Sequence, residues 1–200
     1  GTILCLTCAY RLSAIDSLPG GLHSPGKLHL PGELLSQSPD AERKLSGSAV
    51  MVLVFKLDHS LRTKKEPLSI IETWGDQPHT YCEHHASKSN INDMIFTCSA
   101  REVATLHLCG KGQEAELGRE GFSFQGDHEL QTEPFCSASL VSQVRSQTSI
   151  LCVFLSACNT LQSGRIFLRE GEVLYVVCWD GLVDEILASN FAASFYGYLK

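Results

Sequence analysis

The sequence predicts an α/β protein with a doubly wound, mainly parallel β-sheet and helices on both faces. The first observation is a set of short runs that are almost wholly apolar and rich in β-branched residues, as strands buried on both faces of a parallel sheet are. These runs are Ala49–Leu57, Val103–Leu108, Ile150–Leu155 and Val173–Trp179. The second observation is that amphipathic stretches separate the later runs. Strands that alternate with helices of this size form βαβ units, and therefore a parallel sheet.

Three stretches carry the helical pattern: Ser139–Gln147, Ser163–Glu170 and Asp184–Leu199. The last is the clearest, because its large apolar residues recur at spacings of three and four. They are Ile186, Leu187, Phe191, Phe195 and Tyr198. We therefore expect a closing helix whose apolar side, with Leu187, Phe191 and Phe195, packs into the core.

The sequence divides near residue 48. Residues 1–48 are rich in proline and glycine, as in Leu18-Pro-Gly-Gly-Leu-His-Ser-Pro-Gly-Lys, and predict an irregular N-terminal segment, the tail of a preceding region. Residues 49–200 are expected to form one domain, within which Glu114–Pro134 forms a hairpin excursion with Phe122–Phe124 as a short strand. The N-terminus is apolar but lacks the basic start of a signal peptide. The chain also does not begin with Met, so we expect it to be a fragment of a longer chain.

Composition excludes several classes of partner. The 200 residues are 44% hydrophobic and 19% charged, with a formal net charge of −6. Without a basic stripe, neither nucleic acid nor an anionic membrane is expected as a partner, and no apolar run reaches the roughly 18 residues of a membrane span. Nine scattered cysteines, several within strand-like runs, favour a reducing, cytoplasmic location over a disulfide framework.

No metal or cofactor is expected. Cys5-x-x-Cys8 has the spacing of half a zinc site, but no second pair of ligands completes it. The cluster Cys82-Glu83-His84-His85 also carries ligand types and is interpreted as a polar loop.

Two predicted strands are followed by segments whose residues could bind a ligand or take part in catalysis. Val103–Leu108 is followed by Gly110-Lys111-Gly112, and Ile150–Leu155 by Ser156-Ala157-Cys158-Asn159-Thr160. Functional groups of open parallel sheets gather beyond the carboxyl ends of the strands. We therefore expect these two segments to lie side by side.

Four blocks, in order along the chain, resemble the CHAT domain, a caspase-like family often attached to tetratricopeptide repeats. Val153-Phe-Leu-Ser-Ala-Cys-Asn-Thr160 is similar to the family's nucleophile strand and is the most specific of them. The other blocks are Thr105-Leu-His-Leu-Cys-Gly-Lys-Gly112, Val176-Val-Cys-Trp179 and the closing pattern Ala188-x-x-Phe191-x-x-x-Phe195-Tyr196-x-x-Leu199. The resemblance covers about Glu66 to Lys200.

The resemblance implies a site. Cys158 would be the nucleophile, Gly112 would offer a backbone amide to an oxyanion, and Lys111 stands where the family has the histidine of Gly-His-Gly. Lys111 and Cys158 are 47 residues apart, close to the spacing of about 50 between histidine and cysteine in caspases. The family also implies a peptide or protein as substrate or partner, and a tetratricopeptide-repeat region elsewhere in the full-length protein.

The lysine changes the expected chemistry. A cysteine peptidase needs a base that accepts the thiol proton and returns it to the leaving amine. Lysine can favour a nearby thiolate through its charge, but with an ordinary pKa of about 10.4 it stays protonated at pH 7. The leading hypothesis is therefore a degenerate cysteine peptidase, a pseudoenzyme that serves as an interaction or regulatory module.

Two other hypotheses remain open. The first is an active cysteine endopeptidase, a hydrolase in which a displaced histidine is the base. His128 is then the first candidate, because His107 is expected to be a packed core histidine, and His79, His84 and His85 are not placed by the sequence. The second is a small-molecule-binding domain of flavodoxin-like shape, although Gly110-Lys111-Gly112 is too short for a phosphate-binding P-loop. Two interpretations of Trp179 and Asp180 are equally good. Both residues line a substrate groove, or Trp179 belongs to the core and Asp180 to a solvated turn.

Overall fold

The computed structural model describes residues 2–5, 45, 48–54, 62–75, 79–83, 86, 90–112, 122–125, 132–134 and 137–200. Its centre is a six-stranded sheet in the order β1-β9-β8-β4-β2-β3, in which every ladder is parallel. The strands are β1 (Thr2–Cys5), β2 (Ala49–Val54), β3 (Thr80–Glu83), β4 (Val103–Cys109), β8 (Cys152–Ser156) and β9 (Tyr175–Cys178). The predicted parallel α/β architecture is confirmed.

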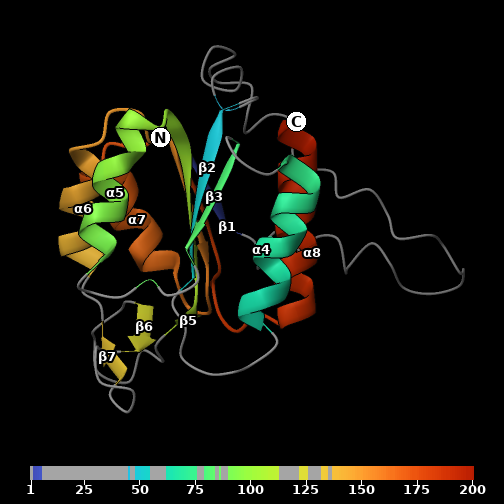
Figure 1. The fold of residues 1–200 in the computed structure, drawn as a ribbon. Helices are drawn as coiled ribbons and strands as arrows, with labels where there is room; N and C mark the ends of the chain where they lie inside the picture. The colour runs from blue at the N-terminus through green and yellow to red at the C-terminus, as the bar shows by residue number, and fades with distance from the viewer. Residues whose placement is uncertain are drawn as a thin grey trace, which may run out of the picture.

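Helices cover both faces of this sheet (Figure 1). On one face lie α5 (Ile91–Ala100), α6 (Ser137–Arg145) and α7 (Leu161–Glu170), and on the other lie α4 (Arg62–Trp74) and α8 (Glu185–Leu199). Successive side chains of a strand point to opposite faces. In β4, Leu106 and Leu108 therefore join the first layer, whereas Cys109 joins the second.

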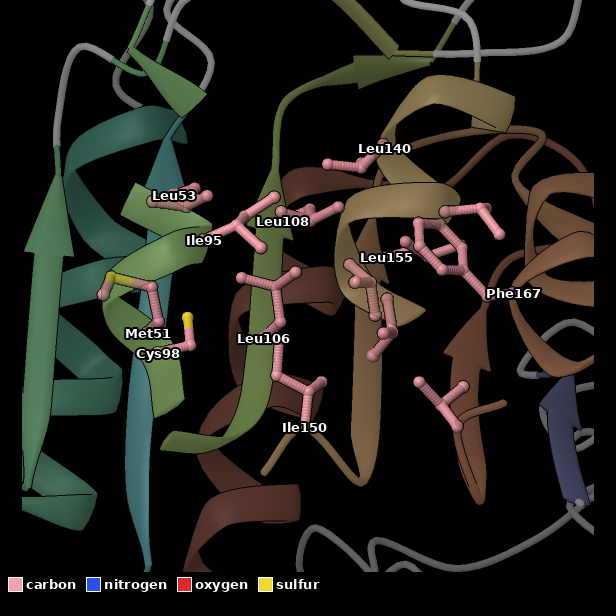
Figure 2. Close-up of a cluster of buried hydrophobic side chains, with 14 of the residues drawn as sticks. Met51, Leu53, Ile95, Cys98, Leu106, Leu108, Leu140, Ile150, Leu155 and Phe167 are labelled. Carbon is pink, nitrogen blue, oxygen red and sulfur yellow. The ribbon is translucent and has the colours of Figure 1, made fainter. Parts of the chain in front are cut away.

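The core on the α5–α7 face fills the space between the strands and these helices. Figure 2 shows it: Leu106 and Leu108 of β4 lie between Ile95 and Cys98 of α5 on one side and Leu155 of β8 on the other. The second core contains the buried Phe191 and Phe195 of α8, with Leu187 packed against it. The expectation that the closing helix packs into the core is confirmed.

The two strands that carry the predicted site are neighbours. β4 and β8 pair in parallel, with Leu106 opposite Val153 and Cys109 opposite Ser156. After Gly110 the chain leaves this sheet and enters a small antiparallel sheet of β5 (Lys111–Gly112), β6 (Phe122–Gln125) and β7 (Thr132–Pro134), seen at the lower left of Figure 1. The predicted short strand at Phe122–Phe124 is confirmed within it.

Six of the described elements were not predicted from the sequence: β1, α4, β3, α5, β5 and β7. Helix α4 contains Pro67, which argues against a helix by local propensity. Strand β1 lies within residues 1–48, expected to be irregular, yet it pairs with β9 at the edge of the main sheet. Its four residues are too few to show a periodic pattern. The strand forms because its backbone groups make hydrogen bonds with β9.

None of the helices in the described ranges combines the length and the apolar character that crossing a bilayer requires.

Candidate functional site

Cys158 lies in the turn that joins β8 to α7, two residues beyond the end of β8. Its side chain is half-buried and packs against the core of the α4–α8 face. The thiol contacts the backbone of Val183: the Val183 N–H donates to Sγ at 3.4 Å, and the S–H donates to the Val183 carbonyl at 3.8 Å. The sulfur is thus held by a backbone amide of the segment between β9 and α8.

Backbone hydrogen bonds join this turn to the segment that follows β9. Asn159 N–H donates to the Gly181 carbonyl at 2.9 Å, and Thr160 N–H to the Trp179 carbonyl at 2.9 Å. Asn159 has φ of 53° and Gly181 has φ of 109°, so both occupy the left-handed region, which asparagine and glycine tolerate best. These bonds fix the position from which Cys158 presents its sulfur.

The hydroxyl of Thr160 adds a further tie between the two segments. It donates to the Ala157 carbonyl at 3.1 Å and accepts from the Trp179 N–H at 3.1 Å. On the other side of the loop, Asp184 caps α8 by accepting from the N–H groups of Ile186 and Leu187. The segment between β9 and α8 is thus fixed at one end by the turn of Thr160 and at the other by the capped N-terminus of α8.

Lys111 and Gly112 lie at the same end of the sheet as Cys158. The Gly110 N–H donates to the Ser156 carbonyl at 3.2 Å, which continues the β4–β8 ladder by one residue. Lys111 and Gly112 then pair with Ser123 and Phe122 in the small sheet. The structure therefore brings the backbones of the two predicted segments together at neighbouring strand ends. The side chain of Lys111 lies outside what the structure describes.

His107 is a core histidine, as expected. Its side chain is fully buried and stacks on Phe154 with 4.4 Å between ring centroids. One ring nitrogen, Nδ1, lies 3.0 Å from the Tyr196 hydroxyl, and the other, Nε2, lies 3.0 Å from Oε1 of Glu66. Both ring nitrogens are occupied within the core, so this imidazole is not available to Cys158.

Glu66 was not identified from the sequence as part of the site. It comes from α4, is only 4% exposed, and its second oxygen accepts from the thiol of Cys109 at 3.4 Å. Burial alone raises the pKa of the Glu66 carboxyl, but hydrogen bonds from His107, Ser156 and Cys109 and the attraction to His107 outweigh burial and hold that pKa below its usual value. The signal available in the sequence is its spacing of four and eight residues from the buried Ile70 and Trp74.

The other histidine that the structure describes, His79, is at the opposite end of the sheet. It lines a depression of about 520 Å³ together with Ala49, Arg101, Ala104 and Leu151, which mark the amino ends of the strands. Ligand sites of open parallel sheets belong to the carboxyl ends, so we place the candidate site at Cys158 and not in this depression. His84, His85 and His128 lie outside the described residues.

Trp179 is a core residue, and Asp180 is a solvated residue. Trp179 is 4% exposed and packs edge-on against Phe191, with 6.0 Å between ring centroids. Its indole N–H has no hydrogen-bond partner in the described part of the chain. Asp180 is exposed. The structure therefore supports the core interpretation of Trp179.

Four of the five remaining described cysteines are more deeply buried than Cys158. Cys98, Cys109, Cys152 and Cys178 are buried, whereas Cys82 is partly exposed. Burial raises the pKa of Cys98 and of Cys152 to about 12, and that of Cys82 to about 11. Within the described ranges, no three His, Cys, Asp or Glu side chains gather as metal ligands. Cys8 lies outside the described residues, as does the side chain of Cys5.

No family model matches the chain, and no curated protein matches it either.

Proposed function

We propose that residues 49–200 form a CHAT-type, caspase-like domain in which Cys158 occupies the position of a peptidase nucleophile and Lys111 has replaced the histidine base. The domain then acts as an interaction or regulatory module for a protein or peptide partner in the cytoplasm. It is attached in the full-length protein to a tetratricopeptide-repeat region. Neither a nucleic acid nor a membrane is a partner in this proposal.

The observation that carries the proposal is the placement of Cys158. It is half-buried in a turn just beyond the carboxyl end of the central strand β8, and the chain of Gly110, Lys111 and Gly112 leaves the adjacent strand β4 at the same end. In open parallel sheets this is where functional groups gather. The four motif blocks and this placement favour the same site independently.

The missing base supports loss of hydrolysis. General acid–base catalysis is typically worth about 10²–10⁴-fold in rate, and a protonated lysine can donate a proton but cannot first remove one from the thiol. His107, the nearest described histidine along the sequence, is occupied by Glu66 and Tyr196 in the core. The Val183 N–H holds Sγ in place, and the side chain is only half-buried, so a reactive thiol without hydrolysis is the expected behaviour.

The test combines a thiol probe with a gain-of-function variant. We expect iodoacetamide to label Cys158 of the unmodified protein, as mapped by peptide mass spectrometry, while a fluorogenic peptide library is not cleaved. Lys111→His should produce measurable cleavage, because the imidazole can take and return the proton. Cys158→Ala in the same background should abolish that cleavage.

The competing function is an active cysteine endopeptidase with a displaced histidine. Its distinguishing result is cleavage by the unmodified protein that disappears in Cys158→Ala. His128→Ala would then be the next variant, because this histidine lies in the segment that precedes the nucleophile strand. Cleavage that survives Cys158→Ala would contradict both functions.

A further inference from the structure

The buried carboxylate of Glu66 joins three elements of the fold. It projects from α4, its Oε1 lies 3.0 Å from Nε2 of His107 in β4, and its Oε2 accepts from the thiol of Cys109, the last residue of β4, at 3.4 Å. The side chain of Ser156, the last residue of β8 and the ladder partner of Cys109, also lowers the pKa of this carboxyl. One carboxylate therefore binds the carboxyl end of β4 and interacts with the neighbouring end of β8.

The geometry points to Glu66 as a positioning residue for the site at Cys158. Cys109 and Ser156 are direct partners in the parallel ladder. The residues that follow them are Gly110 and Lys111 on one strand, and Ala157 and Cys158 on the other. By fixing the two strand ends against each other and against α4, Glu66 sets the relative position of the two site segments without facing them itself.

The charge of Glu66 explains why these bonds hold. A carboxylate that is 4% exposed is costly to bury unless most of its lone pairs receive hydrogen bonds. His107, Cys109 and Ser156 supply these bonds, and they keep the pKa of the carboxyl low. The other ring nitrogen of His107 lies against the Tyr196 hydroxyl. Burial raises the pKa of Tyr196 well above its usual value, so the phenol keeps its proton. Losing the carboxylate leaves several buried donors without an acceptor.

This inference rests on the proposed site at Cys158, but not on peptidase activity. The experiment follows the alkylation of Cys158 by iodoacetamide under native conditions, with Cys82 of the same molecule as the reference thiol. In Glu66→Gln we expect the ratio of the Cys158 rate to the Cys82 rate to rise roughly threefold to tenfold, the range that one lost hydrogen bond allows. The reason is that loosened strand ends expose the half-buried sulfur. Glu72→Gln, an exposed position on the same helix, should leave the ratio unchanged.

A merely stabilising role of Glu66 gives a different result. Easier global opening would accelerate the alkylation of Cys82, Cys98, Cys152 and Cys158 in step and leave the ratio unchanged, which would overturn the inference. Ser156→Ala removes only the β8 side of the contact, and it decides the question if Glu66→Gln does not fold: a raised ratio supports the inference, and an unchanged ratio overturns it. If Cys158 of the unmodified protein is as unreactive as Cys98, the proposed site itself fails, and the inference fails with it.

Discussion

At the scale of single residues, the chemistry of this protein depends on how two side chains are surrounded. Cys158 is half-buried and held by the backbone of Val183, so its sulfur is kept in place yet remains near the surface. Glu66 is buried and surrounded by donors from two strands. The first arrangement suits a reactive group, whereas the second suits a group that holds others in place.

The Glu66 carboxylate should make stability depend on acid pH. Because its pKa is lower in the folded protein than in the unfolded chain, its contribution is fully present above the unfolded value, about 4.3, and is lost as the pH falls through the folded value. We expect Glu66→Gln to lower the free energy of unfolding by roughly 1–3 kcal/mol at pH 7. The difference from the unmodified protein should then shrink as the pH falls below about 4.3.

Urea unfolding at a series of pH values measures this difference. The groups that face Glu66, namely His107, Cys109, Ser156 and Tyr196, keep their identity in the variant. Glu72→Gln should follow the unmodified protein at every pH. A constant difference between Glu66→Gln and the unmodified protein from pH 7 to pH 3 would contradict the assignment of an ionised carboxylate.

At the scale of elements, α8 joins the core to the site. Its N-terminus is capped by Asp184, next to the residue that holds Cys158. Its apolar side packs on β8 through Phe154, whose ring lies 5.3 Å from that of Phe195 and 6.0 Å from that of Phe191. The helix therefore stabilises the sheet and anchors the loop that contacts the sulfur.

We expect Phe195→Ala to cost roughly 3–5 kcal/mol in the free energy of unfolding, because it removes a buried ring that packs against Phe154 and Tyr196. Tyr198→Ala is the matched control on the same helix. Tyr198 is 55% exposed, so its removal should change the free energy of unfolding by only about 0.5 kcal/mol or less. Equal urea midpoints for the two variants would show that α8 is peripheral to the core.

At the scale of the whole molecule, stability should be greatest in the middle of the sheet. β4 and β8 each have a strand on both sides, and every residue of both strands is buried. β3 lies at an edge, and three of its four residues are only partly buried. The candidate site thus lies at the end of two inner strands that are buried along their whole length.

Native-state hydrogen exchange tests this order. We expect the amides of Leu106 to Leu108 and of Val153 to Leu155 to exchange only through global unfolding, because they lie in central, fully buried strands. The amides of β3 should exchange faster, through local opening. Protection of β3 equal to that of β4 would indicate that the edge is covered in solution.

Local patterns in the sequence were sufficient for the four inner strands of the main sheet and for placing the two site segments next to each other. An apolar, β-branched run identifies a buried strand by itself, and consecutive βαβ units place successive strands side by side. The pairing of Val103–Leu108 with Ile150–Leu155 and the packing of Phe191 and Phe195 were predictable for this reason. The boundaries were not, since Ile150, Val173 and Trp179 lie outside the strands as the structure assigns them.

Tertiary structure alone decided which polar groups meet. Glu66 is separated by 41 residues from His107 and by 43 from Cys109. It lies on α4, which helix propensity does not predict because the helix contains Pro67. The hydrogen bond from the Val183 N–H to the sulfur of Cys158 likewise joins residues that are 25 positions apart. The sequence by itself determined the four inner strands of the main sheet, their parallel arrangement and the position of Cys158 at a strand end, because each follows from short-range periodicity. The buried network and the environment of the thiol depend on how α4 and α8 pack across the sheet, which no local pattern encodes.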